Sequence, residues 1–380
     1  MTIKLYYENP YMKNFSAVVK KCSKEKDGFH VILNKTAFYP EGGGQPSDFG
    51  TIAGTSVSYV YEKDEEIIHI CEKAIEEAKE VFCEILWERR FLFMQQHSGE
   101  HIISGIIFRN FGFHNVGFHM NTEEVRIDFD GFLSAEDILT AEKTANDIIF
   151  KNYDIKAYYP GHSELKKLNY RSKKELSGDI RIVEIPCADV CACCGLHVLK
   201  TGEIGIIKAV SSEAYKGGSR LLLKIGKNAF EDYNIKLLNI HDISAMLSSK
   251  PDEAAAAVKK LYAVSQSLKF ENHNLKTRIF EYKTKEYEGK EKAIVFEDGL
   301  TSDELIRFCD MLILKTSFAA VFSGDDKTGY KYSIGSLSKE VYEESKRLNN
   351  ALDGKGGGKG NIISGYIKNT KKNILAYFED

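Results

Sequence analysis

One stretch decides how the fold is interpreted, Gln95-Gln96-His97-Ser98-Gly99-Glu100-His101, because it places two histidines four residues apart. The flanking residues 87–96 and 102–110 contain no proline and carry mixed apolar stripes, so we expect a single helix. Residues i and i+4 of a helix project from the same face, one turn apart. Two such imidazoles can share a metal ion, although helical histidine pairs without a ligand are also common.

A second motif lies about ninety residues downstream, Cys193-Cys194-Gly195-Leu196-His197. Its thiolate and imidazole are four positions apart. With His97 and His101 they form a set of one cysteine and three histidines, which suits zinc. The wide separation of the two halves is typical of a site assembled across a fold. The alternative is a reduced cysteine cluster beside unrelated histidines.

The bulk composition describes an ordinary globular protein. The chain has 380 residues, 43% hydrophobic and 28% charged, so we expect two or three domains with sizeable cores. The net charge of −3 excludes a strongly basic surface over the whole chain, so RNA binding would use local patches. The N-terminus does not have the pattern of a signal peptide, and no apolar run has the length of a membrane span. We expect a cytoplasmic protein without a membrane partner.

Eight cysteines in a chain of this length do not indicate a disulfide scaffold. Four of them crowd one segment: Cys187, Cys191, Cys193 and Cys194. This crowding favours metal binding in a reducing compartment. Cys187 or Cys191 could take the place of Cys193 as the thiolate ligand, but the spacing to His197 favours Cys193.

Four segments follow from the patterns along the chain, and the fold class is predicted as α+β. Residues 1–85 contain short runs of β-branched and aromatic residues between turns, which predicts a small barrel or sandwich. Residues 86–235 predict an α/β domain that holds the metal. Residues 236–289 predict a helical linker. Residues 290–380 predict a C-terminal α/β domain with a glycine-rich segment.

The predicted linker has an apolar stripe with a coiled-coil-like spacing: Leu261, Val264, Leu268, Asn272, Leu275, Ile279 and Tyr282. Three arrangements remain open. The helix could form an antiparallel hairpin with residues 230–247, a dimer seam, or a connecting helix packed on its own domain.

Three consecutive glycines, Gly42, Gly43 and Gly44, lie between Glu41 and Gln45. Glycine allows positive φ and a close approach of the backbone to a ligand, and exposed N–H groups can hold an oxyanion. Taken alone, the glycines are better explained as a plain hairpin turn.

Three motifs in this order resemble the AlaX family, the freestanding relatives of the editing domain of alanyl-tRNA synthetase. They are Phe38-Tyr39-Pro40-Glu41-Gly42-Gly43-Gly44-Gln45, then Trp87-Glu88-Arg89-Arg90 with Met94-Gln95-Gln96-His97-Ser98-Gly99-Glu100-His101, and Cys193-Cys194-Gly195-Leu196-His197-Val198. The resemblance covers residues 1 to about 230. It departs from the family pattern Cys-Gly-Gly-Thr-His at Cys194 and Leu196, which affects local polarity and substrate choice.

The C-terminal part resembles the glycine-rich domain of alanyl-tRNA synthetase, which the long form of AlaX also carries. The matching segment is Gly354-Lys355-Gly356-Gly357-Gly358-Lys359-Gly360-Asn361. The resemblance implies tRNA binding, with Lys355 and Lys359 as the contacts, and dimerisation through this domain and the linker. A flexible tight connection is the structural alternative.

The resemblance implies a hydrolase that deacylates tRNA(Ala) carrying a wrong amino acid, chiefly serine and secondarily glycine. The catalytic residues it implies are Thr36, Gly42, Gly43, Gly44 and Gln45, with Zn²⁺ held by His97, His101, Cys193 and His197. The Gly42–Gly44 backbone would supply oxyanion donors, and Thr36 would contact the serine hydroxyl. Four protein ligands usually close a structural zinc site. A zinc-stabilised tRNA-binding module without turnover is therefore the alternative.

Overall fold

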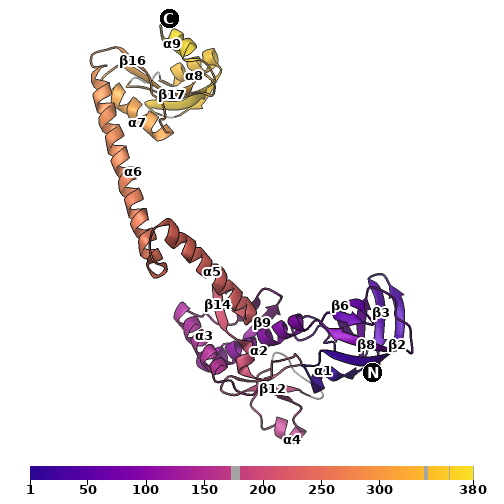
Figure 1. Ribbon diagram of the computed structural model, residues 1–380. Helices are drawn as coiled ribbons and strands as arrows, with labels where there is room; N and C mark the ends of the chain where they lie inside the picture. Colours follow the sequence, from indigo (N-terminus) through magenta and orange to yellow (C-terminus); the bar gives the residue numbers. More distant parts are fainter. Residues whose placement is uncertain (173–179, 338–340, 359, 380) are drawn as a thin grey trace. The chain divides into compact units, whose positions relative to one another are not determined.

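The computed structural model describes residues 1–172, 180–337, 341–358 and 360–379. The chain divides into two compact units, residues 1–242 and 243–380. Helices and sheets occur in both units, so the predicted mixed composition of α and β elements is confirmed (Figure 1). The finer division at residues 85, 235 and 289 stays a prediction.

The N-terminal part of the first unit contains six strands that close into a barrel in the order β2-β3-β7-β6-β5-β8 (Figure 1). They are β2 (Asn14–Glu25), β3 (Gly28–Leu33), β5 (Gly50–Ile52), β6 (Thr55–Lys63), β7 (Glu66–Cys71) and β8 (Glu80–Ile85). Side chains of a strand alternate between faces. In β8, Val81, Cys83 and Ile85 are accordingly buried, and the residues between them are exposed. The barrel encloses a core of its own.

A short parallel pair, β1 (Ile3–Lys4) and β4 (Lys35–Thr36), and helix α1 (Leu5–Glu8) lie in the same N-terminal segment. The segment between β4 and β5 contains the three glycines. It follows β4, which ends at residue 36, and leads into the barrel strand β5, which begins at residue 50.

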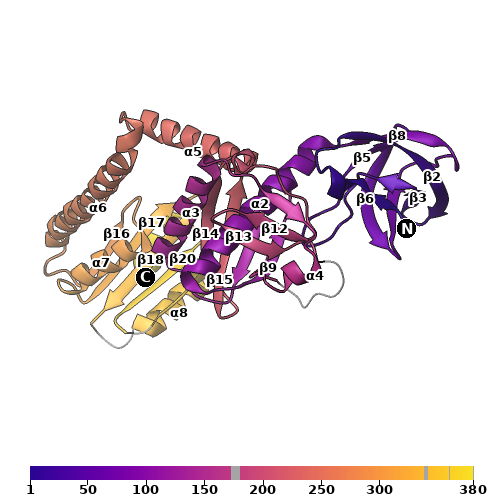
Figure 2. The same cartoon turned by 90° about the horizontal axis from the view of Figure 1, so that it is seen from below.

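Helix α2 (Trp87–Phe111) is the predicted histidine helix, and it ends at Gly112, whose φ of 74° forms the left-handed cap. The second core of this unit is built around it. The other elements are β9 (Asn115–Met120), β10 (Val125–Phe129), α3 (Ala135–Phe150), β11 (Lys156–Tyr158), α4 (His162–Leu165), β12 (Ile182–Ile185), β13 (Asp189–Ala192), β14 (Ile207–Tyr215), β15 (Gly218–Ile225) and α5 (Lys227–Met246). They make one sheet in the order β14-β15-β10-β9 and another in the order β11-β12-β13 (Figure 2).

A glycine of α2 lets β13 approach the helix closely. A Cβ at Gly105 would lie only 2.4 Å from the carbonyl oxygen of Ala188, closer than such atoms can approach. Because β13 begins at the next residue, this close approach brings the side chains of β13 within reach of α2. The metal-binding motifs meet at this junction.

In the second unit, a five-stranded sheet has the order β16-β17-β18-β20-β19. Its elements are α6 (Ala254–Lys285), β16 (Lys292–Phe296), α7 (Ser302–Ile313), β17 (Phe318–Asp325), β18 (Gly329–Ser336), α8 (Val341–Leu352), β19 (Gly354–Gly357), β20 (Ile362–Ile367) and α9 (Lys371–Glu379). The apolar side of α7 packs in one cluster, with Phe280 of α6 stacked on Phe308 at 4.4 Å between ring centroids. Helices α8 and α9 pack in a second cluster on other residues of the sheet.

The apolar stripe of α6 is solvent-exposed in this structure. The exposed fractions of Leu261, Leu268 and Tyr282 are 55, 59 and 65%. The coiled coil therefore stays a prediction. Within the described residues, none of the helices combines the length and apolar character needed to cross a bilayer.

Candidate metal centre

The structure brings together the four residues that the sequence predicted as ligands. His97 and His101 lie on α2, and Cys193 and His197 lie in the loop that follows β13. One donor atom from each residue lies within 4.8 Å of the others. The ring centroids of His97 and His197 are 4.6 Å apart, and those of His101 and His197 are 4.9 Å apart. The group could hold a metal ion.

The unpaired ring nitrogens fit such an ion. Nε2 of His101 and Nε2 of His197 are buried and have no hydrogen-bond partner among the described residues. A buried polar atom left unpaired costs about 1–3 kcal/mol, so both nitrogens call for a partner. Burial lowers the pKa of His197 to about 3, which keeps its ring neutral and able to ligate.

The thiol is held in the form that binds metals. Burial alone would raise the pKa of Cys193, but the neighbouring His97 and His101 outweigh burial and bring the pKa well below its usual value. Its Sγ atom lies 3.4 Å from Nε2 of His97 and accepts the Gly195 N–H at 3.3 Å. The thiolate is the metal ligand of cysteine, so the environment favours coordination.

Each of the three rings is oriented through its other nitrogen, Nδ1, which faces an oxygen atom. The contacts are His97 to Gln45 Oε1 at 3.0 Å, His101 to Asp189 Oδ2 at 2.8 Å and His197 to Ser98 Oγ at 3.4 Å. A ring that donates from Nδ1 carries its free lone pair on Nε2. The arrangement therefore turns the Nε2 atoms toward one point, as in known metal sites.

Asp189 and Arg171 are part of this site and were not found from the sequence. Arg171 donates to Asp189 twice, from Nε at 2.8 Å and from Nη2 at 2.7 Å. Burial would raise the pKa of Asp189, but the hydrogen bonds from His101 and Arg171 prevail and hold it below the usual value. The sequence could have indicated Asp189, because residues 189, 191 and 193 follow the two-residue period of a strand and therefore project toward one face. Nothing in the sequence pointed to Arg171.

The other cysteines of the crowded segment differ in position. Cys191 is buried and forms a second candidate group with His101 and Asp189, so it stays an alternative thiolate. Cys187 is exposed, and it belongs to neither candidate group within the described chain. Cys194 is exposed as well.

The glycine segment forms a tight turn beside the metal group. Gly42 and Gln45 exchange two backbone hydrogen bonds of 3.1 and 2.9 Å, and Gly43 and Gly44 have φ of 59° and 82°. The N–H of Gly42 is therefore used inside the turn, which corrects the expectation that all three glycines could be oxyanion donors. The N–H groups of Gly43 and Gly44 have no hydrogen-bond partner in the part of the chain that the structure describes.

The turn is tied to the cysteine loop by several contacts. Gln45 Oε1 accepts the Leu196 N–H at 2.9 Å as well as the His97 contact. Tyr39 Oη donates to the Cys194 carbonyl at 3.3 Å, and Tyr7 Oη donates to the same oxygen at 3.0 Å. The Leu196 side chain is fully buried in the core around α2. At this departure from the family pattern the side chain therefore packs in the protein interior.

Thr36 lies at the end of β4 with no exposed surface. Its hydroxyl contacts Nε2 of His69 at 2.9 Å and accepts the Phe38 N–H at 3.1 Å. Burial lowers the pKa of His69 to about 4, so the ring is neutral; Nδ1 donates to the Val31 carbonyl and Nε2 accepts from Thr36. The two hydrogen bonds of Thr36 are thus with His69 and Phe38 of the N-terminal segment, and only one lone pair of its oxygen is left for a substrate.

The glycine-rich segment of the second unit is an edge strand over residues 354–357, and not the flexible tight connection that the sequence left open as the structural alternative. Packing explains the difference. A Cβ at Gly356 would lie 2.4 Å from Oη of Tyr332, so only glycine lets this tyrosine cross the strands. Lys355 is exposed on β19. Lys359 lies outside the described residues.

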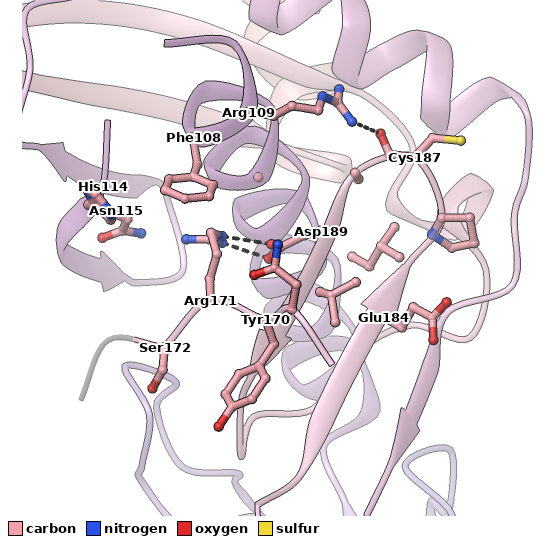
Figure 3. A pocket seen from close by; sticks show the side chains of 16 residues that line it. Phe108, Arg109, His114, Asn115, Tyr170, Arg171, Ser172, Glu184, Cys187 and Asp189 are labelled. Atoms are coloured by element: carbon pink, nitrogen blue, oxygen red, sulfur yellow. Dashed lines mark hydrogen bonds and ion pairs between the residues drawn. The ribbon is translucent and has the colours of Figure 1, made fainter. Parts of the chain in front are cut away.

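A cavity of about 570 Å³ opens beside Asp189 and Arg171, the two residues behind His101 (Figure 3). Phe108 and Arg109 of α2, and Arg171 with Asp189, contribute to its wall. Arg109 donates to the Cys187 carbonyl at 2.7 Å. Figure 3 shows the Arg171 side chain directed at the Asp189 carboxylate.

Comparisons with known proteins identify the family to which the chain belongs. Residues 5–89 match the family of class II (A) tRNA synthetases, and residues 180–221 match the second additional domain of threonyl and alanyl tRNA synthetases. The chain is 30% identical to an alanyl-tRNA editing protein of Danio rerio, over 93% of this chain and 91% of that protein. This chain belongs to the alanyl-tRNA editing protein family.

Two further relatives support the assignment. AlaX-L of Pyrococcus horikoshii, an alanyl-tRNA editing protein, is 28% identical over 99% of this chain and 97% of its own length. An alanine–tRNA ligase of Ignicoccus hospitalis is 32% identical over 95% of this chain. The match covers only 40% of that ligase. The predicted resemblance to AlaX is therefore confirmed.

Proposed function

We propose that this protein removes a wrongly attached amino acid from tRNA(Ala), with serine as the main substrate and glycine as the second. Two relatives are named alanyl-tRNA editing proteins, so the activity of the family is the deacylation of aminoacyl-tRNA in trans. The bond to be hydrolysed is the ester between the amino acid and the terminal ribose. A cytoplasmic location is part of this proposal, since charged tRNA is used there.

One observation carries the proposal: the donor group of His97, His101, Cys193 and His197 lies next to a turn in which two backbone N–H groups have no partner among the described residues. We propose zinc as the ion, because one thiolate and three imidazoles suit it. A bound zinc ion would polarise a substrate oxygen.

The residues of the chain would supply the rest of the chemistry. Ester hydrolysis develops negative charge on the carbonyl oxygen, and fixed N–H donors lower the energy of that state. Gly43 and Gly44 are the candidates for these donors. Gln45 acts as a positioning residue, because its Oε1 atom is occupied by His97 and Leu196. The aromatic ring of Phe118, 5.4 Å from the His97 ring between centroids, would restrict water beside the ligand.

A second candidate function is a zinc-stabilised tRNA-binding module without turnover. It is favoured by the number of protein ligands, since four such ligands usually close a tetrahedral site. We also propose that the second unit binds tRNA through Lys355 and Lys359, and that the exposed stripe of α6 contributes to a homodimer.

The test is to measure hydrolysis rates of the full chain, loaded with zinc, on seryl-, glycyl- and alanyl-tRNA(Ala). We expect the seryl ester to be cleaved fastest and the alanyl ester to be spared. His101→Ala serves as the control, and it should abolish turnover. Tight tRNA binding without hydrolysis of any ester would favour the second candidate, and equal cleavage of all three would exclude an editing role.

A further inference from the structure

We infer that Asp189 and Arg171 are positioning residues that determine how tightly the metal is held, acting through His101. This inference rests on the metal site of the proposed function. It concerns the second layer of that site, because neither residue is one of the four proposed ligands.

The three histidines are not held alike. His97 faces the neutral amide oxygen of Gln45 at 3.0 Å. His197 faces Ser98 Oγ at 3.4 Å, beyond the usual range, and the same oxygen already accepts the Val198 N–H at 3.1 Å. His101 faces a carboxylate at 2.8 Å. Of the three rings, His101 therefore has the shortest contact and the partner with a full charge.

The carboxylate is itself fixed. Arg171 donates a hydrogen bond to each of its two oxygens. This bidentate geometry is the strongest form of an arginine–carboxylate pair. The side chains of Asp189 and Arg171 are only 2 and 12% exposed. The backbone of Arg171 is also tied to β13, because its N–H donates to the Val190 carbonyl at 2.8 Å and its carbonyl accepts the Ala192 N–H at 2.9 Å. The arginine and the aspartate are thus anchored to one strand.

This arrangement has a direct consequence for the ligand. A carboxylate that accepts from Nδ1 fixes the ring tautomer, keeps the Nε2 lone pair free and raises the basicity of that nitrogen. Arg171 keeps the carboxylate in place and compensates its buried charge. Without the arginine, Asp189 would keep only its contact with the neutral His101 ring and could rotate away from that ring.

Asp189 and Arg171 can also be substituted without replacing any of the four proposed metal ligands. Arg171 and Asp189 line the cavity of Figure 3, and Asp189 contacts the Nδ1 side of His101, whereas the metal would be bound on the Nε2 side. A change at Arg171 therefore leaves the four donor atoms in place. Its effect on the metal must pass through Asp189 and His101.

The experiment compares metal affinity in full-length Asp189→Asn, Arg171→Lys and wild-type protein by competition with a zinc chelator. The cobalt(II) form provides a second readout, since its thiolate absorption band reports whether the ligands are unchanged. We expect Asp189→Asn to weaken zinc binding by about ten- to a hundredfold with the cobalt band retained. Arg171→Lys, which keeps the charge but loses the two-pronged grip, should have a smaller effect in the same direction.

Asp128→Asn is the matched control. Arg220 grips Asp128 in the same two-pronged way, at 2.6 and 2.8 Å, but Asp128 contacts no proposed ligand in the described structure. This variant should lose some stability and keep wild-type zinc affinity. If Asp189→Asn does not fold, Arg171→Lys decides the question alone.

Two results would overturn the inference, and they can be told apart. Unchanged zinc affinity in both variants, with a lower melting temperature, would make the pair purely structural. A wild-type protein that binds neither zinc nor cobalt(II) would remove the metal site of the proposed function together with this inference.

Discussion

Two glycine-rich segments of this chain have opposite structural roles. Residues 42–44 form a turn with two left-handed glycines and two N–H groups that no described residue accepts. Residues 354–357 form an edge strand that pairs with β20 in a regular ladder. The first segment uses the freedom of glycine in φ. The second uses the absence of a side chain, since Tyr332 occupies the space of a Cβ at Gly356.

The comparison shows that a run of glycines does not by itself identify a ligand-binding loop. The surroundings decide its role. The turn at residues 42–44 ends at Gln45, which contacts a proposed metal ligand, and it lies beside the cysteine loop. The strand at residues 354–357 has an aromatic side chain beneath it and one exposed lysine. Catalytic effects are therefore expected from the first segment, and effects on stability and on tRNA affinity from the second.

The largest expected effect concerns the cysteine loop beside the first segment. Cys193→Ala should lower the zinc content from about one ion per chain to nearly none, because three imidazoles without the thiolate bind zinc far less tightly. Cys191→Ala should keep its zinc, since Cys191 is assigned only to the alternative group. Elemental analysis of both purified variants checks this. Full zinc in the first variant and loss in the second would transfer the ligand role to Cys191.

A smaller effect is expected from Gly44→Ala. Alanine is strained at a φ of 82°, and its Cβ would lie 2.5 Å from the Phe118 ring, which faces His97. The turn must shift, so we expect single-turnover hydrolysis of seryl-tRNA(Ala) to slow by about a hundredfold while zinc is kept. Rapid-quench kinetics with a zinc determination is the measurement.

Gly356→Ala is the corresponding change in the second segment. It should lower the free energy of unfolding by about 1–3 kcal/mol through overpacking against Tyr332, with the hydrolysis rate unchanged. If Gly356→Ala slowed hydrolysis as much as Gly44→Ala, the proposed separation of roles between the two segments would be lost.

The metal group was predictable because its signals are local in the sequence. The spacing of His97 and His101 on a helix, and of Cys193 and His197, depends only on the chain near each pair. The contacts that orient the rings were harder to predict. Gln45 was singled out for its motif but was taken as catalytic, and the ion pair of Arg171 with Asp189 depends on how two distant segments meet.

In the fold, too, local features could be predicted from the sequence and long-range features could not. Helix α2 lies where the sequence pattern around His97 and His101 placed it. Ser134 and Thr301 form capping boxes at the starts of α3 and α7, which are local features of the sequence. The glycine-rich edge strand was missed because its pairing depends on Tyr332 from another strand. Strand pairing and side-chain crossing are long-range features, so composition alone could not reveal them.

Thr36 precedes the first glycine segment, and Thr36→Val tests whether that segment also selects the amino acid. We expect the preference for seryl- over alanyl-tRNA(Ala) to narrow by about ten- to a hundredfold, the value of one hydrogen bond to a substrate hydroxyl. The buried Nε2 of His69 would also lose its donor, so the stability should fall by about 1–3 kcal/mol. Paired deacylation rates and urea unfolding provide the data. A lower stability with an unaltered ratio would restrict Thr36 to a structural role in the barrel.

The smallest effect is expected at Lys355 in the second glycine segment. Lys331 of β18 and Lys355 of β19 are both paired with Tyr366 of the strand between them, and direct cross-strand partners lie on one face of a sheet. All three are exposed, so the row offers two cations around an aromatic ring, which suits an RNA backbone. Lys355→Ala should weaken tRNA(Ala) binding a few-fold and reduce the slope of log affinity against log salt by about one, with single-turnover hydrolysis unchanged.

Lys315→Ala is the control for that change, because Lys315 is also exposed in the second unit but lies after α7 and pairs with Glu288 at 2.9 Å. Its removal should leave both the affinity and the salt slope as in the wild type. Filter binding at several salt concentrations measures both variants. Equal losses at Lys315 and Lys355 would indicate a diffuse electrostatic effect. An unchanged affinity at Lys355 would leave the second glycine segment with a structural role alone, in which Gly356 accommodates Tyr332.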